Sequence, residues 1–159
     1  MGLEDLLSVS IIIVVTAFSF VILAVVWNAM LPEFQASAIN STTTNSIWMN
    51  VSVVVNMWDG MVIIAQALAI FFLLVSVYFL DSHPVFFVAM LFIFIISIFA
   101  GGIYSAVWTA FTSNTDINNT VNSYFPMTNI LMNNYAVVAL VAGFLFLIAL
   151  YAKATGGIR

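Results

Sequence analysis

Cysteine is absent from the 159 residues of the chain. Its absence excludes disulfides, thiolate metal sites and cysteine nucleophiles. Charge is almost as scarce, because Asp, Glu, Lys and Arg make up 5% of the residues, whereas soluble domains average about 25%. So few charged side chains cannot cover the surface of a soluble protein, and no basic cluster is present that could bind nucleic acid.

Hydrophobic residues, in contrast, make up 65% of the chain. A helix needs about 20 consecutive apolar residues to cross the hydrocarbon core of a bilayer. Four uncharged runs approach that length, at about 8–30, 61–80, 85–111 and 135–152. The sequence therefore predicts an all-α integral membrane bundle of four transmembrane helices in a single domain, residues 1–159. The short connection between the second and third runs predicts a tight antiparallel hairpin.

The segments between the other runs are rich in Asn, Ser and Thr, residues that are typical of turns. We predict polar loops at 31–60 and 112–134, on one side of the membrane. The first run is expected to stop at Leu31-Pro32-Glu33, because a proline and a carboxylate make further helix in lipid costly. Residues 51–55 fit either a short strand or an early part of the second helix.

The orientation is predicted from the positive charges, which normally stay on the cytoplasmic side. Lys153 and Arg159 are the only such residues, so both termini are predicted to lie on the cytoplasmic or inner side. Aromatic residues near the ends of the runs are typical anchors at the membrane interface. The anchors that we predict are Trp27, Trp58, Trp108 and Tyr151.

The residues that could carry chemistry are few. All six carboxylates are predicted to lie in termini, loops or span edges: Glu4, Asp5, Glu33, Asp59, Asp81 and Asp116. The single histidine, His83, lies between Ser82 and Pro84, a pattern typical of a helix cap. The alternative is a metal or cofactor site that partner chains complete. No phosphate-binding loop, Ser-His-Asp set or HExxH motif occurs. We therefore expect no enzyme activity, no catalytic residue, no bound cofactor and no metal site.

Small residues recur every four positions in the third run. Such rows let a second helix approach closely, which favours association in lipid. One row contains Ser97, Gly101, Ser105 and Thr109, and the adjoining row contains Gly102, Ala106 and Ala110. The fourth run offers Ala139 and Gly143 as a shorter row, with Ala136 nearby. We predict helix contacts along these rows and take Phe94 as a position that faces lipid.

Gln66 is the strongly polar side chain well inside a predicted span. A buried amide seeks a partner in lipid, so we predict a hydrogen bond from Gln66 to a neighbouring helix. Pore lining or contact with a ligand is the alternative.

In its short length, scarcity of charge and Asn/Thr-rich segments, such as 41–45 and 118–120, the chain resembles small polytopic membrane proteins of lipid-containing prokaryotic viruses. That resemblance implies a structural role in a virion membrane. We therefore expect a non-catalytic role in assembly, with the lipid bilayer and other membrane proteins or copies of the chain as partners. The alternatives are a pore-forming oligomer of the holin kind and an accessory subunit of a respiratory or oxidase complex.

Overall fold

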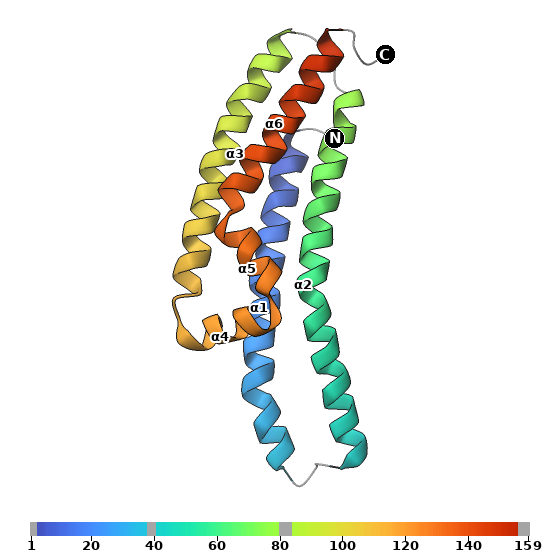
Figure 1. The fold of residues 1–159 in the computed structure, drawn as a ribbon, viewed down its shortest axis with the longest axis vertical. Helices are drawn as coiled ribbons and strands as arrows, with labels where there is room; N and C mark the ends of the chain where they lie inside the picture. The colour runs from blue at the N-terminus through green and yellow to red at the C-terminus, as the bar shows by residue number, and fades with distance from the viewer. Residues whose placement is uncertain (1–2, 38–40, 80–83, 156–159) are drawn as a thin grey trace.

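The computed structural model describes residues 3–37, 41–79 and 84–155 (Figure 1). These residues form helices and no strand. The elements are α1 (Leu3–Ala36), α2 (Thr42–Ser76), the 3-10 helix η1 (Val77–Phe79), α3 (Pro84–Phe111), α4 (Thr115–Tyr124), α5 (Pro126–Asn133) and α6 (Tyr135–Ala154). The predicted turn around His83 lies outside the described residues.

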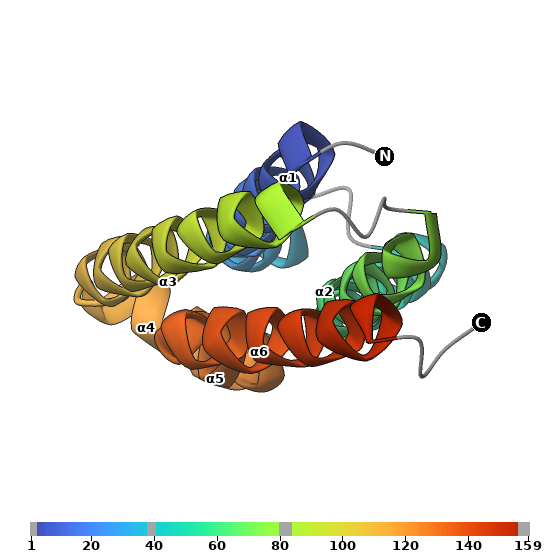
Figure 2. The same ribbon diagram turned by 90° about the horizontal axis from the view of Figure 1, so that it is seen from above.

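Four of the helices are long and apolar enough to cross a membrane. They run alternately up and down, so that the described ends of α1 and α6, Leu3 and Ala154, lie toward the same end of the bundle (Figures 1 and 2). The prediction of an all-α bundle with four apolar spans is confirmed. The candidate spans are Ile11–Ala36, Thr42–Ser76, Phe87–Phe111 and Tyr135–Ala154.

α1 does not stop at Pro32, as the sequence predicted, but continues to Ala36. Pro32 removes one helical hydrogen bond, and because it lies in the last turns of α1 only a short segment of helix follows it. Phe34 stacks on Trp48 of α2 with ring centroids 4.6 Å apart, and Ser37 Oγ donates to the Phe34 carbonyl. These contacts stabilise the last turn of α1 and offset the local cost of the proline.

α2 begins at Thr42, so most of the loop predicted at 31–60 is helix instead. Ser41 caps the helix reciprocally with Thr44, because each side-chain oxygen accepts from the other residue's backbone N–H. The pattern is a capping box with Thr in place of the usual Glu or Gln. Residues 51–55 belong to α2, which excludes the strand.

The second predicted loop also contains two helices. Asn114 Oδ1 accepts from the backbone of Asp116 and Ile117 and starts α4, which lies across the end of α3 (Figure 1). α5 follows after Phe125 and turns back toward α6, with Pro126 in its first turn. The polar residues between the third and fourth spans therefore form a compact corner rather than a loop.

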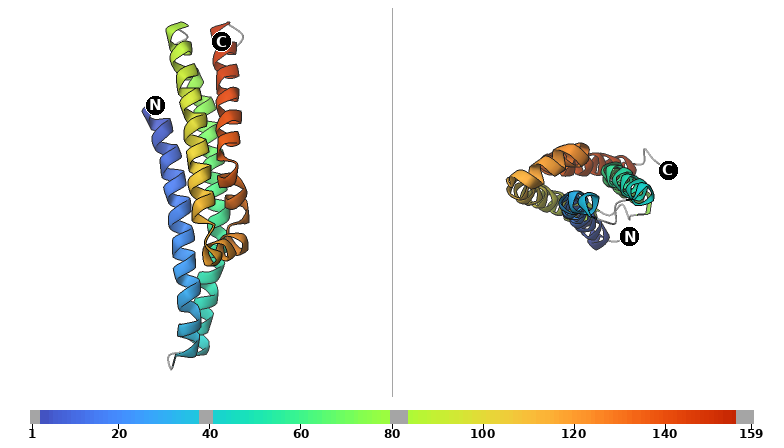
Figure 3. Two further views of the ribbon diagram at one scale, coloured as in Figure 1. Left: turned by 90° about the vertical axis from the view of Figure 1, so that its left-hand side faces the viewer. Right: turned by 90° about the horizontal axis from the view of Figure 1, so that it is seen from below.

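The helices pack as two antiparallel hairpins, α1 with α2 and α3 with α6, joined through α4 and α5. The larger core lies beside α4 and α5 and includes Val21, Val55 and Trp108. A smaller core at the opposite end includes Met90 and Phe146. The α1–α2 hairpin extends well past α4, whereas the other end of α1 stops short of the ends of α3 and α6 (Figure 3).

Candidate functional site

Asp59 is the charged side chain that the fold buries among the described residues, at 7% exposure. Its two carboxylate oxygens accept hydrogen bonds from the backbone N–H groups of Met127 at 3.0 Å and Thr128 at 2.7 Å. The sequence had placed Asp59 at the edge of a span that began at residue 61. That prediction was wrong, because α2 is continuous from Thr42 and holds Asp59 near its middle.

The beginning of α5 explains why a carboxylate lies there. Phe125, the N-cap residue, provides no side-chain acceptor, and Pro126 has no N–H. The next two N–H groups have no partner within a helix and need one from elsewhere. Asp59 supplies both acceptors from α2, and the positive end of the α5 dipole further stabilises its negative charge. Asp59 thus acts as the N-terminal cap of a helix that lies 68 residues away in the chain.

Gln66 lies two turns further along α2 on the same face. Its Oε1 accepts a hydrogen bond of 3.2 Å from the hydroxyl of Tyr135, the first residue of α6. Thr128 and Tyr135 each lie 69 residues after their partners on α2. Because the two separations are equal, α5 and the start of α6 run parallel to α2 in one register. We call these two contacts the polar clamp: Asp59 with the start of α5, and Gln66 with Tyr135.

Amide side chains of α4 and α5 form a second polar group. Asn129 Oδ1 accepts from the indole N–H of Trp108 at 2.9 Å and from Asn133 Nδ2 at 2.9 Å. Asn129 Nδ2 donates in turn to Asn122 Oδ1 on α4. This network was not predicted from the sequence, although the four-residue spacing between Asn129 and Asn133 is a signal for neighbours on one helix face.

The row that contains Gly101 faces α5 and α6. A Cβ at Gly101 would lie 2.9 Å from the Cα of Ala136, so no larger residue fits there without a shift of backbone. Ser105 Oγ donates to the Asn133 carbonyl at 2.6 Å, and Thr109 Oγ1 to Asn133 Oδ1 at 3.2 Å. Ser97 Oγ bonds within its own helix, to the carbonyl of Ile93. We call Ser97, Gly101, Ser105 and Thr109 the inner row.

Gly143 on α6 is also a point of close approach. The Phe94 ring occupies the place that a Cβ at Gly143 would need. Phe94 therefore lies between α3 and α6, and our assignment of Phe94 as a position facing lipid was wrong. Ala139, one turn before Gly143, is partly buried.

The adjoining row of α3 points away from the chain. Gly102, Ala106 and Ala110 are exposed, and a Cβ at Gly102 would meet nothing within 4 Å. We call these three residues the open row. The two rows that the sequence grouped together thus lie in different environments.

The aromatic residues predicted as interface anchors lie in two different environments, three of them exposed or partly exposed and one buried. Tyr151 is 63% exposed, and Trp27 and Trp58 are partly exposed, with Trp58 stacked on Phe20. The indole of Trp27 donates to Ser52 Oγ at 3.4 Å. Trp108 is fully buried, so it packs within the core and does not reach lipid, contrary to the expected anchor.

At the opposite end of the bundle, Lys153 Nζ donates to the carbonyl of Val77 at 3.1 Å. This bond ties the end of α6 to η1. Among the described residues, no group of three His, Asp or Glu side chains is placed to hold a metal ion.

The four apolar spans define the class of the protein, which is a multi-pass membrane protein. The chain matches no protein-family model, no curated protein and no solved structure.

Proposed function

We propose that this chain is a non-catalytic structural protein that assembles with other membrane proteins or with copies of itself. The observation that carries the proposal is the open row of α3. Its small side chains leave a shallow strip where a helix from another chain can approach, and Ile103 and Val107 beside it are 62% and 51% exposed. Close packing of this kind drives helix association in lipid.

The use of the polar groups supports the same role. Asp59 caps α5, Gln66 bonds Tyr135, and Asn129 links three other side chains. Polar residues within spans usually mark ion paths or ligand sites. Here Asp59 and Gln66, which lie within the α2 span, serve contacts that hold the fold together, and this favours a structural role over transport or catalysis.

The membrane that we propose for the chain is that of a virion. The Asn/Thr-rich segments and scarce charge are features of small membrane proteins of lipid-containing prokaryotic viruses. In such a membrane many copies lie side by side, and an exposed row of small residues gives neighbouring chains a specific contact.

The open row gives a testable prediction. Gly102→Leu is expected to reduce recovery of partner chains in mild detergent several-fold, because leucine fills the strip and separates the helices. The thermal midpoint of the isolated chain should change little, since the position faces open space. Co-purification followed by mass spectrometry measures the first quantity, and circular dichroism measures the second.

Ala89→Leu is the matched control, since Ala89 is exposed on the same helix but lies outside the open row. It should leave co-purification unchanged. Equal recovery of partners with Gly102→Leu and Ala89→Leu would contradict an assembly role for the open row.

A further inference from the structure

Thr128 carries a buried hydroxyl that has no hydrogen-bond partner among the described residues. The residue is 0% exposed, and its Oγ1 forms no hydrogen bond. A buried hydroxyl without a hydrogen bond costs free energy, so each such group in a folded protein needs an explanation. Thr128 also belongs to the polar clamp, because its backbone N–H donates to Asp59 Oδ1.

The position of Thr128 in α5 explains why its hydroxyl lacks the usual acceptor. Threonine hydroxyls within helices commonly donate to the carbonyl four residues earlier. Other threonines of the chain form this bond: Thr112 to Trp108, Thr120 to Asp116 and Thr155 to Tyr151. Thr128 lies in the first turn of α5, and Tyr124, four residues earlier, belongs to α4. The hydroxyl therefore has no acceptor within its own helix.

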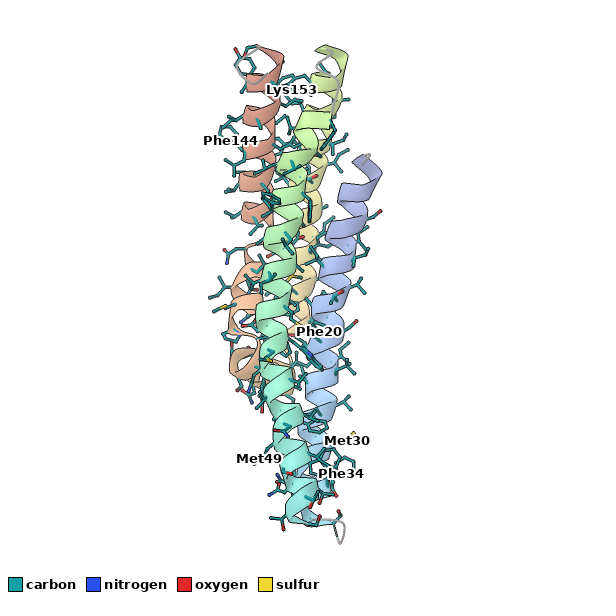
Figure 4. The ribbon with its side chains drawn as sticks, turned by 90° about the vertical axis from the view of Figure 1, so that its right-hand side faces the viewer. Phe20, Met30, Phe34, Met49, Phe144 and Lys153 are labelled. Atoms are coloured by element: carbon teal, nitrogen blue, oxygen red, sulfur yellow. The ribbon has the colours of Figure 1, made fainter. Side chains whose placement is uncertain are left out.

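The polar clamp lies well inside the bundle and far from its ends. Asp59 follows Trp58, whose ring stacks on Phe20 of α1. Figure 4 shows Phe20 between the two ends of the bundle, with Phe34 near one end and Lys153 near the other. Lys153 is the one Lys or Arg among the described residues, and it bonds at that far end to Val77. No basic side chain in the described part of the chain therefore bonds to Asp59.

Asp59 has hydrogen-bonding capacity that the polar clamp does not use. Each of its carboxylate oxygens accepts one backbone N–H, from Met127 and from Thr128. An ionised carboxylate offers about four acceptor sites in all. Free acceptor sites of Asp59 and a free donor of Thr128 thus belong to the same pair of bonded residues.

Covalent geometry places these two groups within the span of one water molecule. The rotamers that threonine adopts in helices hold Oγ1 about 3 Å from its own backbone N. That N lies 2.7 Å from Asp59 Oδ1. Oγ1 is therefore no more than about 6 Å from Oδ1, and no hydrogen bond joins the two oxygens. A water molecule with two hydrogen bonds of about 2.8 Å each spans up to about 5.6 Å.

We propose that a buried water molecule binds between Thr128 Oγ1 and the carboxylate of Asp59. The threonine hydroxyl donates to the water oxygen, and one O–H of the water donates to a carboxylate oxygen. Buried waters typically bond to two to four polar groups that the protein leaves unpaired, and this site supplies two. The water joins α5 to α2 a third time, in addition to the two N–H bonds of the cap.

Thr128→Val tests the site, because valine keeps the shape of threonine and removes the hydroxyl. The full chain with this change should lose about 2–4 °C of thermal midpoint in detergent, since a water-mediated bond is worth nearly as much as a direct one. A midpoint that stays the same or rises would overturn the proposal, because removal of a hydroxyl without a partner should not destabilise the fold.

Thr120→Val is the matched control. Thr120 is also buried, at 7% exposure, but its hydroxyl bonds to the carbonyl of Asp116 within α4. Such a bond within a helix adds little stability, so this variant should change the midpoint less than Thr128→Val. Equal losses in the two variants would overturn the proposal.

The occupant is identified by two further measurements on the parent chain. Replacement of sodium chloride by choline chloride at equal concentration should leave the thermal midpoint unchanged, whereas a fall would show that a sodium ion occupies the site instead of water. An experimental structure that resolves ordered water should place one molecule within about 3.2 Å of Thr128 Oγ1 and of an Asp59 oxygen. A direct bond between the two residues' side-chain oxygens, or no water at this place, would overturn the proposal.

Discussion

Asp59→Ala is expected to lower the free energy of unfolding by roughly 2–4 kcal/mol. The change removes two hydrogen bonds from a charged acceptor and leaves the N–H groups of Met127 and Thr128 without partners. The loss should be local at first, because α5 would lose its cap while the long helices remain. Hydrogen exchange at residues 127 and 128 should therefore accelerate before global unfolding, and equilibrium unfolding in mixed detergent micelles measures the total loss.

Two variants separate the cap from a general effect of charge. Asp59→Asn keeps one acceptor oxygen in nearly the same shape but sets its amide N–H2 against the other backbone N–H, so it should recover at most one of the two hydrogen bonds. Asp116→Ala removes an exposed carboxylate at the start of α4 and should cost about 0.5 kcal/mol at most. If Asp59→Ala were no more costly than Asp116→Ala, the cap that Asp59 provides for α5 would have no importance for the fold.

Gly101→Leu is expected to be the most damaging single change on α3. The added side chain would meet the backbone of Ala136 at the first residues of α6, where nothing can rotate away. Forcing a larger group into a packed contact costs about 1–3 kcal/mol, and a clash with backbone lies at the upper end of that range or beyond it. The yield of folded chain and its thermal midpoint in detergent should both fall.

Gly102→Leu is the matched control, because the two glycines are adjacent in sequence and differ in what lies beside them. A Cβ at Gly102 meets open space, so the isolated chain should tolerate leucine there. Similar thermal midpoints for the two variants would show that α3 does not pack on α6 through the inner row.

The four spans were predictable because their signal is local. Each is an apolar run without charge, and a run of that length has few structures open to it other than a membrane helix. The same reasoning predicted the all-α class. The ends of the helices were predicted less well, because those ends depend on contacts that a hydropathy pattern does not contain. Phe34 stacked on Trp48 extends α1 past Pro32, for example.

The polar segments were misread because Asn, Ser and Thr have two roles. They are common in loops, but they also cap helices and bond along helix faces. Ser41 starts α2, and Asn114 starts α4. Neither residue has the Glu or Gln three positions later that usually marks a capping box.

The polar clamp could not be predicted because its two sides are far apart in sequence. Nothing near Asp59 indicates that α5 needs an acceptor, since the need arises from Phe125 and Pro126. The environments of the two rows of small residues could not be predicted either, because the four-residue spacing alone cannot tell which row packs against α6. Gly101 and Gly102 differ only through the position of Ala136 in space.

The number of crossings is the claim on which the other inferences depend. It is tested by single cysteines at positions 2, 43, 118 and 157, labelled with a membrane-impermeant reagent in sealed vesicles of one orientation, since the chain has no native cysteine. Four crossings predict that 43 and 118 react from one side and that 2 and 157 react from the other. Reaction of positions 2 and 157 from opposite sides would contradict the four-span bundle.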